Sequence, residues 1–258
     1  MSDSIQRLRR IMERLRDPVD GCPWDLQQSW KTIVPHTIEE AYELADAIEN
    51  GTIEEVRDEL GDLLFQVVFQ SRIAEEDGLF DLHQVAERIC DKLERRHPHV
   101  FGDARSEVSL AEQSEAWERH KQAERGTLGA LDGVTRGLPA LTRASKLGRR
   151  ASGVGFDWPD ARSVLEKVRE EVGEVEQAID ENNLPQMREE LGDLLFAVAQ
   201  AARRCGLDPE GALREANSKF ERRFRHMEAA LERRGLAPVD VDIVELEALW
   251  SAAKRDGA

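Results

Sequence analysis

The sequence has few features of an extracellular or membrane-bound protein. Its 258 residues include only Cys22, Cys90 and Cys205, which are scattered and form no C-x-x-C motif. Such cysteines are typical of a reducing compartment, where thiols stay free. The longest apolar run, about residues 194–202, is too short to span a bilayer, and Met1–Ser4 lacks the pattern of a signal peptide. We therefore expect a cytoplasmic protein that has no membrane as a partner.

The chain also has fewer basic than acidic residues. The chain has 36 Lys and Arg against 52 Asp and Glu, which gives a formal net charge of −16. This charge repels the phosphates of DNA and RNA and the surface of anionic membranes. We expect no nucleic-acid polymer as a partner, although a small anion could still be held through a metal. The sequence contains no Walker loop, G-x-G-x-x-G, G-x-S-x-G or kinase motif.

Runs of alternating apolar and polar residues, typical of β-strands, are hard to find, whereas Ala, Leu, Glu and Arg are abundant. This composition predicts an all-α fold. Apolar residues spaced three and four apart predict helices in the first half of the chain. These helices cover about residues 5–15, 37–49, 53–76 and 82–96, and a further one lies within 110–125. A turn at residues 20–25 follows the first helix.

The chain repeats itself. Glu40-x-x-Glu43 recurs as Glu171-x-x-Glu174, and ELGD at 59–62 recurs at 190–193. The spacing is kept, because 171 − 40 and 193 − 62 both equal 131. Glycines cluster between the copies, at Gly126, Gly129, Gly133 and Gly137. The repeat predicts two tandem modules, residues 1–126 and 138–258, joined by a Gly-rich linker at 127–137.

Carboxylates on two neighbouring helices mark each module. Glu171 and Glu174 share one helix face, and so do Glu190 and Asp193, because each pair is three residues apart. Helices joined by a short turn usually pack antiparallel, so that all four carboxylates would converge. Like charges at close range take up protons or hold a cation, and oxygen ligands favour Mg²⁺ or Mn²⁺. The first module has the same set at Glu40, Glu43, Glu59 and Asp62.

The ordinary alternative is a solvated helix face on which these glutamates pair with Lys or Arg. Glu171, however, lies between Val168 and Val175 on an apolar stripe that runs from Val164 to Ile179. Burial of an unpaired carboxylate on such a stripe is costly. We expect the stripe to face the core and to provide no basic partner for Glu171.

Other residues of the chain could make space beside the carboxylates or bind a nucleotide. Gly61 and Gly192 lie inside predicted helices, which a close helix approach or space for an ion would explain. Lys219 and Arg223 share a helix face and could hold phosphate oxygens, together with Lys254. Trp250 is a candidate to stack on a base, although aromatics near helix ends are more often core residues. The histidines do not recur at ligand spacing, and we treat them as structural or surface residues.

These motifs, in order and duplicated, resemble the MazG family of nucleoside triphosphate pyrophosphohydrolases, in the all-α NTP pyrophosphatase group. The resemblance covers nearly the whole chain. It includes GCPWD at 21–25, KLERRHPHVFGD at 92–103, VGFDW at 154–158 and KFERRF at 219–224. It implies Mg²⁺-dependent hydrolysis of NTPs and dNTPs to nucleoside monophosphate and pyrophosphate, as nucleotide-pool housekeeping. It also implies a homodimer in which helices of two protomers complete a bundle.

The resemblance also implies roles for individual residues. The expected catalytic residues and metal ligands are Glu171, Glu174, Glu190 and Asp193. The expected nucleotide contacts are Lys219, Arg223, Trp250 and Lys254. The family carries its activity in the C-terminal module, and its N-terminal module is structural or regulatory.

The N-terminal module of this chain nevertheless keeps the full pattern, which leaves its activity open. Its residues are Glu40, Glu43, Glu59 and Asp62, followed by Lys92, Arg96, Trp117 and Lys121. As the base that takes a proton from water, we expect a carboxylate of the cluster or a neighbour such as Glu170 or Glu189.

The sequence is also compatible with other functions. One is a related pyrophosphohydrolase with a narrower substrate, dUTP or phosphoribosyl-ATP. Another is a non-enzymatic helical interaction module whose acidic cluster binds a structural metal. A di-iron carboxylate bundle would have E-x-x-H, whereas both copies here have E-x-x-D.

Overall fold

The structure, a computed structural model, describes residues 2–101 and 129–257. These residues form helices and no β-strand, which confirms the all-α class. Contacts divide the chain into two units, Met1–Arg125 and Gly126–Ala258. The predicted helix within 110–125, with Trp117 and Lys121, lies outside the described residues. None of the described helices has the length and the hydrophobicity needed to cross a membrane.

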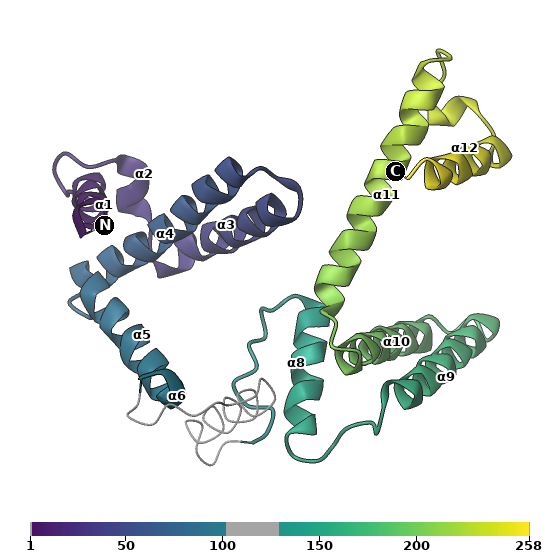
Figure 1. The fold of residues 1–258 in the computed structure, drawn as a ribbon, viewed down its shortest axis with the longest axis horizontal. Helices are drawn as coiled ribbons and strands as arrows, with labels where there is room; N and C mark the ends of the chain where they lie inside the picture. The colour runs from purple at the N-terminus through teal and green to yellow at the C-terminus, as the bar shows by residue number, and fades with distance from the viewer. Residues whose placement is uncertain (1, 102–128, 258) are drawn as a thin grey trace. The chain divides into compact units, whose positions relative to one another are not determined.

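The first unit is built around two long helices that lie side by side (Figure 1). Its helices are α1 (Ser2–Leu15), α2 (Pro23–Gln27), α3 (Trp30–Asn50), α4 (Ile53–Glu76), α5 (Leu82–Arg96) and α6 (Pro98–Phe101). α1 and α3 both pack against α4. The core contains Met12, Ile33, Val68, Phe69 and Ile73.

Side-chain caps explain where these helices begin. Thr52 and Glu55 form a capping box at the start of α4, and Asp81 and Gln84 form one at the start of α5. Both helices have the predicted bounds. The predicted start of α3 near Thr37 is wrong, because Ser29 caps the first turn and the helix continues through Pro35. Proline lacks a backbone N–H, so a proline within a helix is normally unfavourable.

The second unit has a similar helix pair. Its elements are α8 (Ala140–Ser152), α9 (Ala161–Asp180), α10 (Leu184–Arg204), α11 (Pro209–Glu232), a 3₁₀ turn η1 (Pro238–Asp240) and α12 (Ile243–Arg255). α10 packs against both α9 and α8, and α12 packs against α11 (Figure 1). Gln200, fully buried on α10, donates to the carbonyl of Ala144 at 2.7 Å. A side chain at Gly148 would meet the amide of Gln200, so glycine is needed there.

Arginine ion pairs hold the loops of both units against the long helices. In the first unit, Arg16 pairs with Glu76 on α4, Nη2 to Oε2 at 2.6 Å, and donates to the carbonyls of Asp25 and Gln28. In the second unit, Arg203 of α10 pairs with Asp157 in the loop before α9. This arginine holds the pKa of Asp157 below its usual value through a hydrogen bond. Each long helix pair is therefore anchored at one end.

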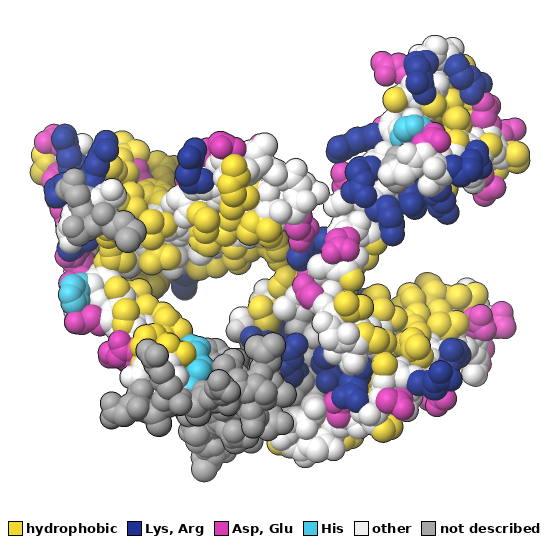
Figure 2. Space-filling view, in the orientation of Figure 1, with side chains coloured by type: hydrophobic (Ala, Val, Ile, Leu, Met, Phe, Trp, Pro, Cys, Tyr) yellow, Lys and Arg dark blue, Asp and Glu magenta, His cyan; other side chains and the backbone are white. Residues whose placement is uncertain are grey.

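Each helix pair also exposes many apolar side chains, and Figure 2 shows hydrophobic atoms gathered over both pairs. The expectation that the stripe of α9 faces the core is only partly right. Val164 is fully buried, whereas Val172 is 40% and Ile179 is 54% exposed. On α10, Leu191, Leu195 and Val198 are exposed as well. A layer of two helices covers one side of each helix and leaves the other uncovered.

Candidate active site

Three carboxylates converge between α9 and α10. Glu171 and Glu174 come from α9, and Glu190 comes from α10. One oxygen atom of each lies within 4.8 Å of those of the other two. The helices are joined by residues 181–183, so a short turn brings the E-x-x-E motif against the ELGD motif. The structure therefore brings together three of the four predicted residues of this site.

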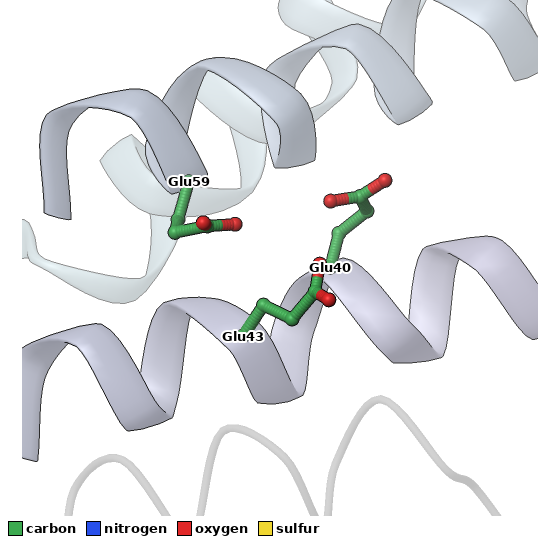
Figure 3. Close-up of side chains that lie close together, drawn as sticks. All are labelled: Glu40, Glu43 and Glu59. Carbon is green, nitrogen blue, oxygen red and sulfur yellow. The ribbon is translucent and has the colours of Figure 1, made fainter. Parts of the chain in front are cut away.

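The same arrangement occurs in the first unit, between α3 and α4. Figure 3 shows Glu59 of α4 extending toward Glu40 and Glu43 of α3. Their carboxylate oxygens also lie within 4.8 Å of one another. The repeated sequence motifs thus form the same cluster of three glutamates in both units.

Asp62 and Asp193, the fourth predicted residue of each cluster, lie outside these groups of three. Each is exposed and lies one helical turn beyond the glutamate of its own helix. Asp62 is still close enough to raise the pKa of Glu40 through its negative charge. In both copies the fourth carboxylate therefore stands at the edge of the cluster.

Burial and mutual repulsion make the ionised cluster unfavourable by itself. Burial raises the pKa of Glu40, and the charges of Asp62 and Glu43 raise it further, while a hydrogen bond from Gln66 partly offsets this. In the second unit, burial and then the charge of Glu171 raise the pKa of Glu174. A bound cation would remove this cost, because it favours the ionised carboxylates.

Glu171 is the most buried residue of either cluster, with 4% of its surface exposed. Contrary to expectation, it has a basic partner: Lys167 lies one turn earlier on α9, with its Nζ 2.7 Å from Glu171 Oε1. The same Nζ lies 2.7 Å from Glu170 Oε1. The two hydrogen bonds, with Glu170 and then Glu171, raise the pKa of Lys167.

The second oxygen of Glu171, Oε2, is buried and has no hydrogen-bond partner among the described residues. A buried oxygen of this kind carries a desolvation cost that a hard cation would offset. The carboxylate set, without His or Cys, therefore fits a divalent metal ion such as Mg²⁺ or Mn²⁺.

The two helical glycines do not mark a close approach within one chain. Among the described residues, a Cβ atom added at Gly61 or Gly192 would meet no atom of another element within 4 Å. The sequence suggested either a close helix approach or space for an ion. The structure favours the second explanation, because the space beside both glycines is open.

The predicted nucleotide contacts form a separate cluster on α11 and α12. The guanidinium carbon of Arg223 lies 6.0 Å from the centre of the Trp250 ring, which also packs against Phe220 at 5.1 Å. Lys219 and Lys254 are exposed. The structure thus places the basic and aromatic set on α11 and α12, whereas the three carboxylates lie on α9 and α10.

The sequence reading missed a chain of hydrogen bonds behind Glu40. Gln70 donates to Thr37 Oγ1 at 2.9 Å, and Thr37 donates to Gln66 Oε1 at 3.3 Å. Gln66, which is 3% exposed, also lowers the pKa of Glu40 against the effect of burial. The signal was present, because a glutamine on the apolar face of a predicted helix needs a partner. At offset 131 the C-terminal module has Val168, Ala197 and Ala201 instead.

Comparison with known proteins agrees with the duplicated pattern. A family model described as the MazG nucleotide pyrophosphohydrolase domain matches residues 28–101 and again 160–228, together more than half of the chain. A nucleoside triphosphate pyrophosphohydrolase of Escherichia coli K12 is 48% identical, over 98% of both chains. A protein of Thermotoga maritima named nucleoside triphosphate pyrophosphohydrolase/pyrophosphatase MazG is 41% identical, over 97% of this chain and 95% of its own.

The raised pKa of Glu174 predicts a pH-dependent effect of Glu174→Gln in protein kept free of divalent cations. The stability that protonated Glu174 contributes is fully present below the ordinary pKa of a glutamate, 4.5, and is lost as the pH rises through the raised pKa. Glutamine is neutral throughout. The variant should therefore unfold at a higher temperature than wild type at about pH 8, with a difference that shrinks toward about pH 5.

Unfolding monitored by circular dichroism in EDTA measures this difference. Glu176→Gln, at an exposed position of the same helix outside the cluster, is the matched control and should show no such trend. If the wild-type protein is more stable than Glu174→Gln at the higher pH, ionised Glu174 is not unfavourable in the cluster, and the prediction is wrong.

Proposed function

The chain belongs to the MazG family of nucleotide pyrophosphohydrolases, and from that premise we propose how its residues divide the work. It is an enzyme that hydrolyses nucleoside triphosphates to nucleoside monophosphates and pyrophosphate. We assign the reaction to the cluster of Glu171, Glu174 and Glu190. The observation that carries this assignment is the unsatisfied, buried Oε2 of Glu171 within a group of converging carboxylates.

In this proposal the metal ligands are Glu171, Glu174, Glu190 and, from the edge of the cluster, Asp193. Mg²⁺ is the expected ion, and Mn²⁺ is an acceptable substitute, since both prefer carboxylate oxygens. Such an ion supplies positive charge that offsets the charge on the phosphate oxygens and makes water more acidic. The carboxylates fix where that charge lies.

The chain's own side chains complete the site in this proposal. Arg223, with its planar guanidinium, and Lys219 hold phosphate oxygens and offset the charge of the departing pyrophosphate. Trp250, already against Arg223, offers a face for the base, and Lys254 adds a further positive charge beside it. Glu189 is exposed next to Glu190 and is suited to take a proton from water, whereas Glu170 is engaged by Lys167.

We also propose a homodimer in which the exposed apolar faces of the long helix pairs pack against those of a second copy. The residues concerned are large hydrophobic side chains that are exposed on both pairs. On α9 and α10 they are Leu165, Val172, Ile179, Leu184, Leu191, Leu195 and Val198. Apolar patches of this extent are uncommon on monomers and usually mark an interaction surface. A cytoplasmic location completes the proposal, since all three cysteines are free thiols.

The reaction class is tested by its products. Incubation of the protein with each NTP and dNTP and Mg²⁺ should release pyrophosphate and the nucleoside monophosphate, and EDTA should stop it. Release of orthophosphate and a diphosphate, or turnover that persists in EDTA, would contradict the proposal. Strict selectivity for dUTP would favour the narrower pyrophosphohydrolase, and absence of turnover would favour a binding module.

Two matched substitutions test which copy does the chemistry. Glu190→Ala should lower turnover by about 100-fold or more, with little change in circular dichroism, because it removes a ligand of the ion whose positive charge acts at the reacting phosphate. Glu59→Ala, at the equivalent position of the first unit, should leave turnover largely intact. If Glu190→Ala retains turnover and only the double variant loses it, the N-terminal cluster is a working site.

The dimer is tested by light scattering after gel filtration. The wild-type protein should have twice the monomer mass of 29.2 kDa. Leu191→Glu, on the exposed face of α10, should shift it toward monomer because a charge in an apolar interface is costly. Val239→Glu, a 91% exposed position in η1, is the control and should stay dimeric. A wild-type monomer at micromolar concentration would refute the dimer.

A further inference from the structure

The two carboxylate clusters differ in the charge placed against their first ligand. In the C-terminal cluster, Lys167 Nζ lies 2.7 Å from Glu171. The position 131 residues earlier is His36, because 167 − 131 = 36. His36 lies 3.6 Å from Glu39 and edge-on to Trp24, and among the described residues it makes no ion pair with Glu40. The ammonium group is thus a feature of one copy only.

The two modules also hold the equivalent glutamates by different means. Glu40 is only partly buried, and the neutral amide of Gln66 lowers its pKa. Glu171 is almost fully buried, has apolar Ala197 at the position equivalent to Gln66, and depends on the cation of Lys167. A buried carboxylate needs a partner, and an ion pair and a neutral hydrogen bond both meet that need. Only the ion pair adds a positive charge to the site.

The two carboxylate oxygens of Glu171 differ in their partners. Oε1 is paired with Lys167, while Oε2 is buried without a partner among the described residues. The ammonium therefore fixes the carboxylate in one orientation with the second oxygen available. The same charge, a few ångströms away, repels any cation that Oε2 would bind. Lys167 consequently has two opposed effects, on the position of Glu171 and on the affinity of the site.

We propose that Lys167 is a positioning residue that acts as an internal counter-cation of the C-terminal cluster, stabilising Glu171 while lowering the affinity of that cluster for a divalent cation. This inference rests on the proposed metal site of Glu171, Glu174 and Glu190. It makes the C-terminal cluster the weaker cation site of the two, although both have the same three glutamates. The N-terminal cluster, whose glutamates make no ion pair with Lys or Arg among the described residues, binds the same ion more tightly.

Mn²⁺ titration of the full-length chain without nucleotide tests the inference by calorimetry. A Glu59→Ala background leaves the C-terminal cluster as the site that is measured. In that background Lys167→Met should bind Mn²⁺ about tenfold more tightly, because a nearby positive charge is removed. Lys167→Arg, which keeps the charge, should restore the weaker binding.

A second readout separates this role from a purely structural one. In EDTA, Lys167→Met should unfold at a lower temperature than its parent, since Glu171 loses its partner, and Mn²⁺ should raise that temperature by more than it does in the parent. Arg225→Met removes an exposed ion pair of the same i, i+4 spacing and is the matched control, with unchanged Mn²⁺ affinity. A reciprocal His36→Lys, in a Glu190→Ala background, should weaken Mn²⁺ binding at the N-terminal cluster.

Two outcomes would overturn the inference, and they differ in what they leave standing. If Lys167→Met binds Mn²⁺ no more tightly than its parent, Lys167 is no counter-cation, while the metal site itself stands. If neither protein binds Mn²⁺ at the C-terminal cluster, the metal assignment of the proposed function fails together with this inference.

Discussion

The structure of each module depends on one electrostatic constraint, the gathering of carboxylates between two antiparallel helices. The E-x-x-E and ELGD motifs fix three oxygen atoms within 4.8 Å of one another in each unit. In the second unit the most buried of them, Glu171, has one oxygen paired with Lys167 and the other unsatisfied among the described residues. Such a group is unstable in isolation and stable around a cation. The arginine anchors of both units, and Gln200 in the second, hold the helices that carry the glutamates.

Much of this arrangement could be predicted from the sequence, because it follows from local patterns. The bounds of α4 and α5 follow from apolar periodicity and strong caps, and the carboxylates converge because three-residue spacing and a short turn leave little freedom. The start of α3 was missed because Pro35 resembles a helix boundary while Ser29 provides the real one. Lys167 was missed although it lies four residues before Glu171, a spacing at which side chains meet. The outward position of Asp62 and Asp193 depends on helix rotation, which spacing alone leaves undetermined.

The duplication shows how one scaffold holds two differently charged sites. Membership of the MazG family accounts for the shared frame, since the family model matches both modules. The two modules differ in the side chains beside the carboxylates. In the first module Gln66, Thr37 and Gln70 form a chain of neutral, hydrogen-bonded side chains. The second module has apolar residues and a lysine instead. Both modules leave apolar faces uncovered on the same helix pairs, so the surface proposed to join two copies adjoins the helices that carry the carboxylates.

In the proposed site, the converging glutamates of the C-terminal module hold a divalent cation. Crystals grown or soaked with Mn²⁺, measured at a wavelength where manganese scatters anomalously, test it most directly. We expect an anomalous peak within coordination distance of Glu171, Glu174 and Glu190, about 2.0–2.3 Å from their oxygens. Absence of a peak there at millimolar Mn²⁺, with the three carboxylates still in place, would contradict it.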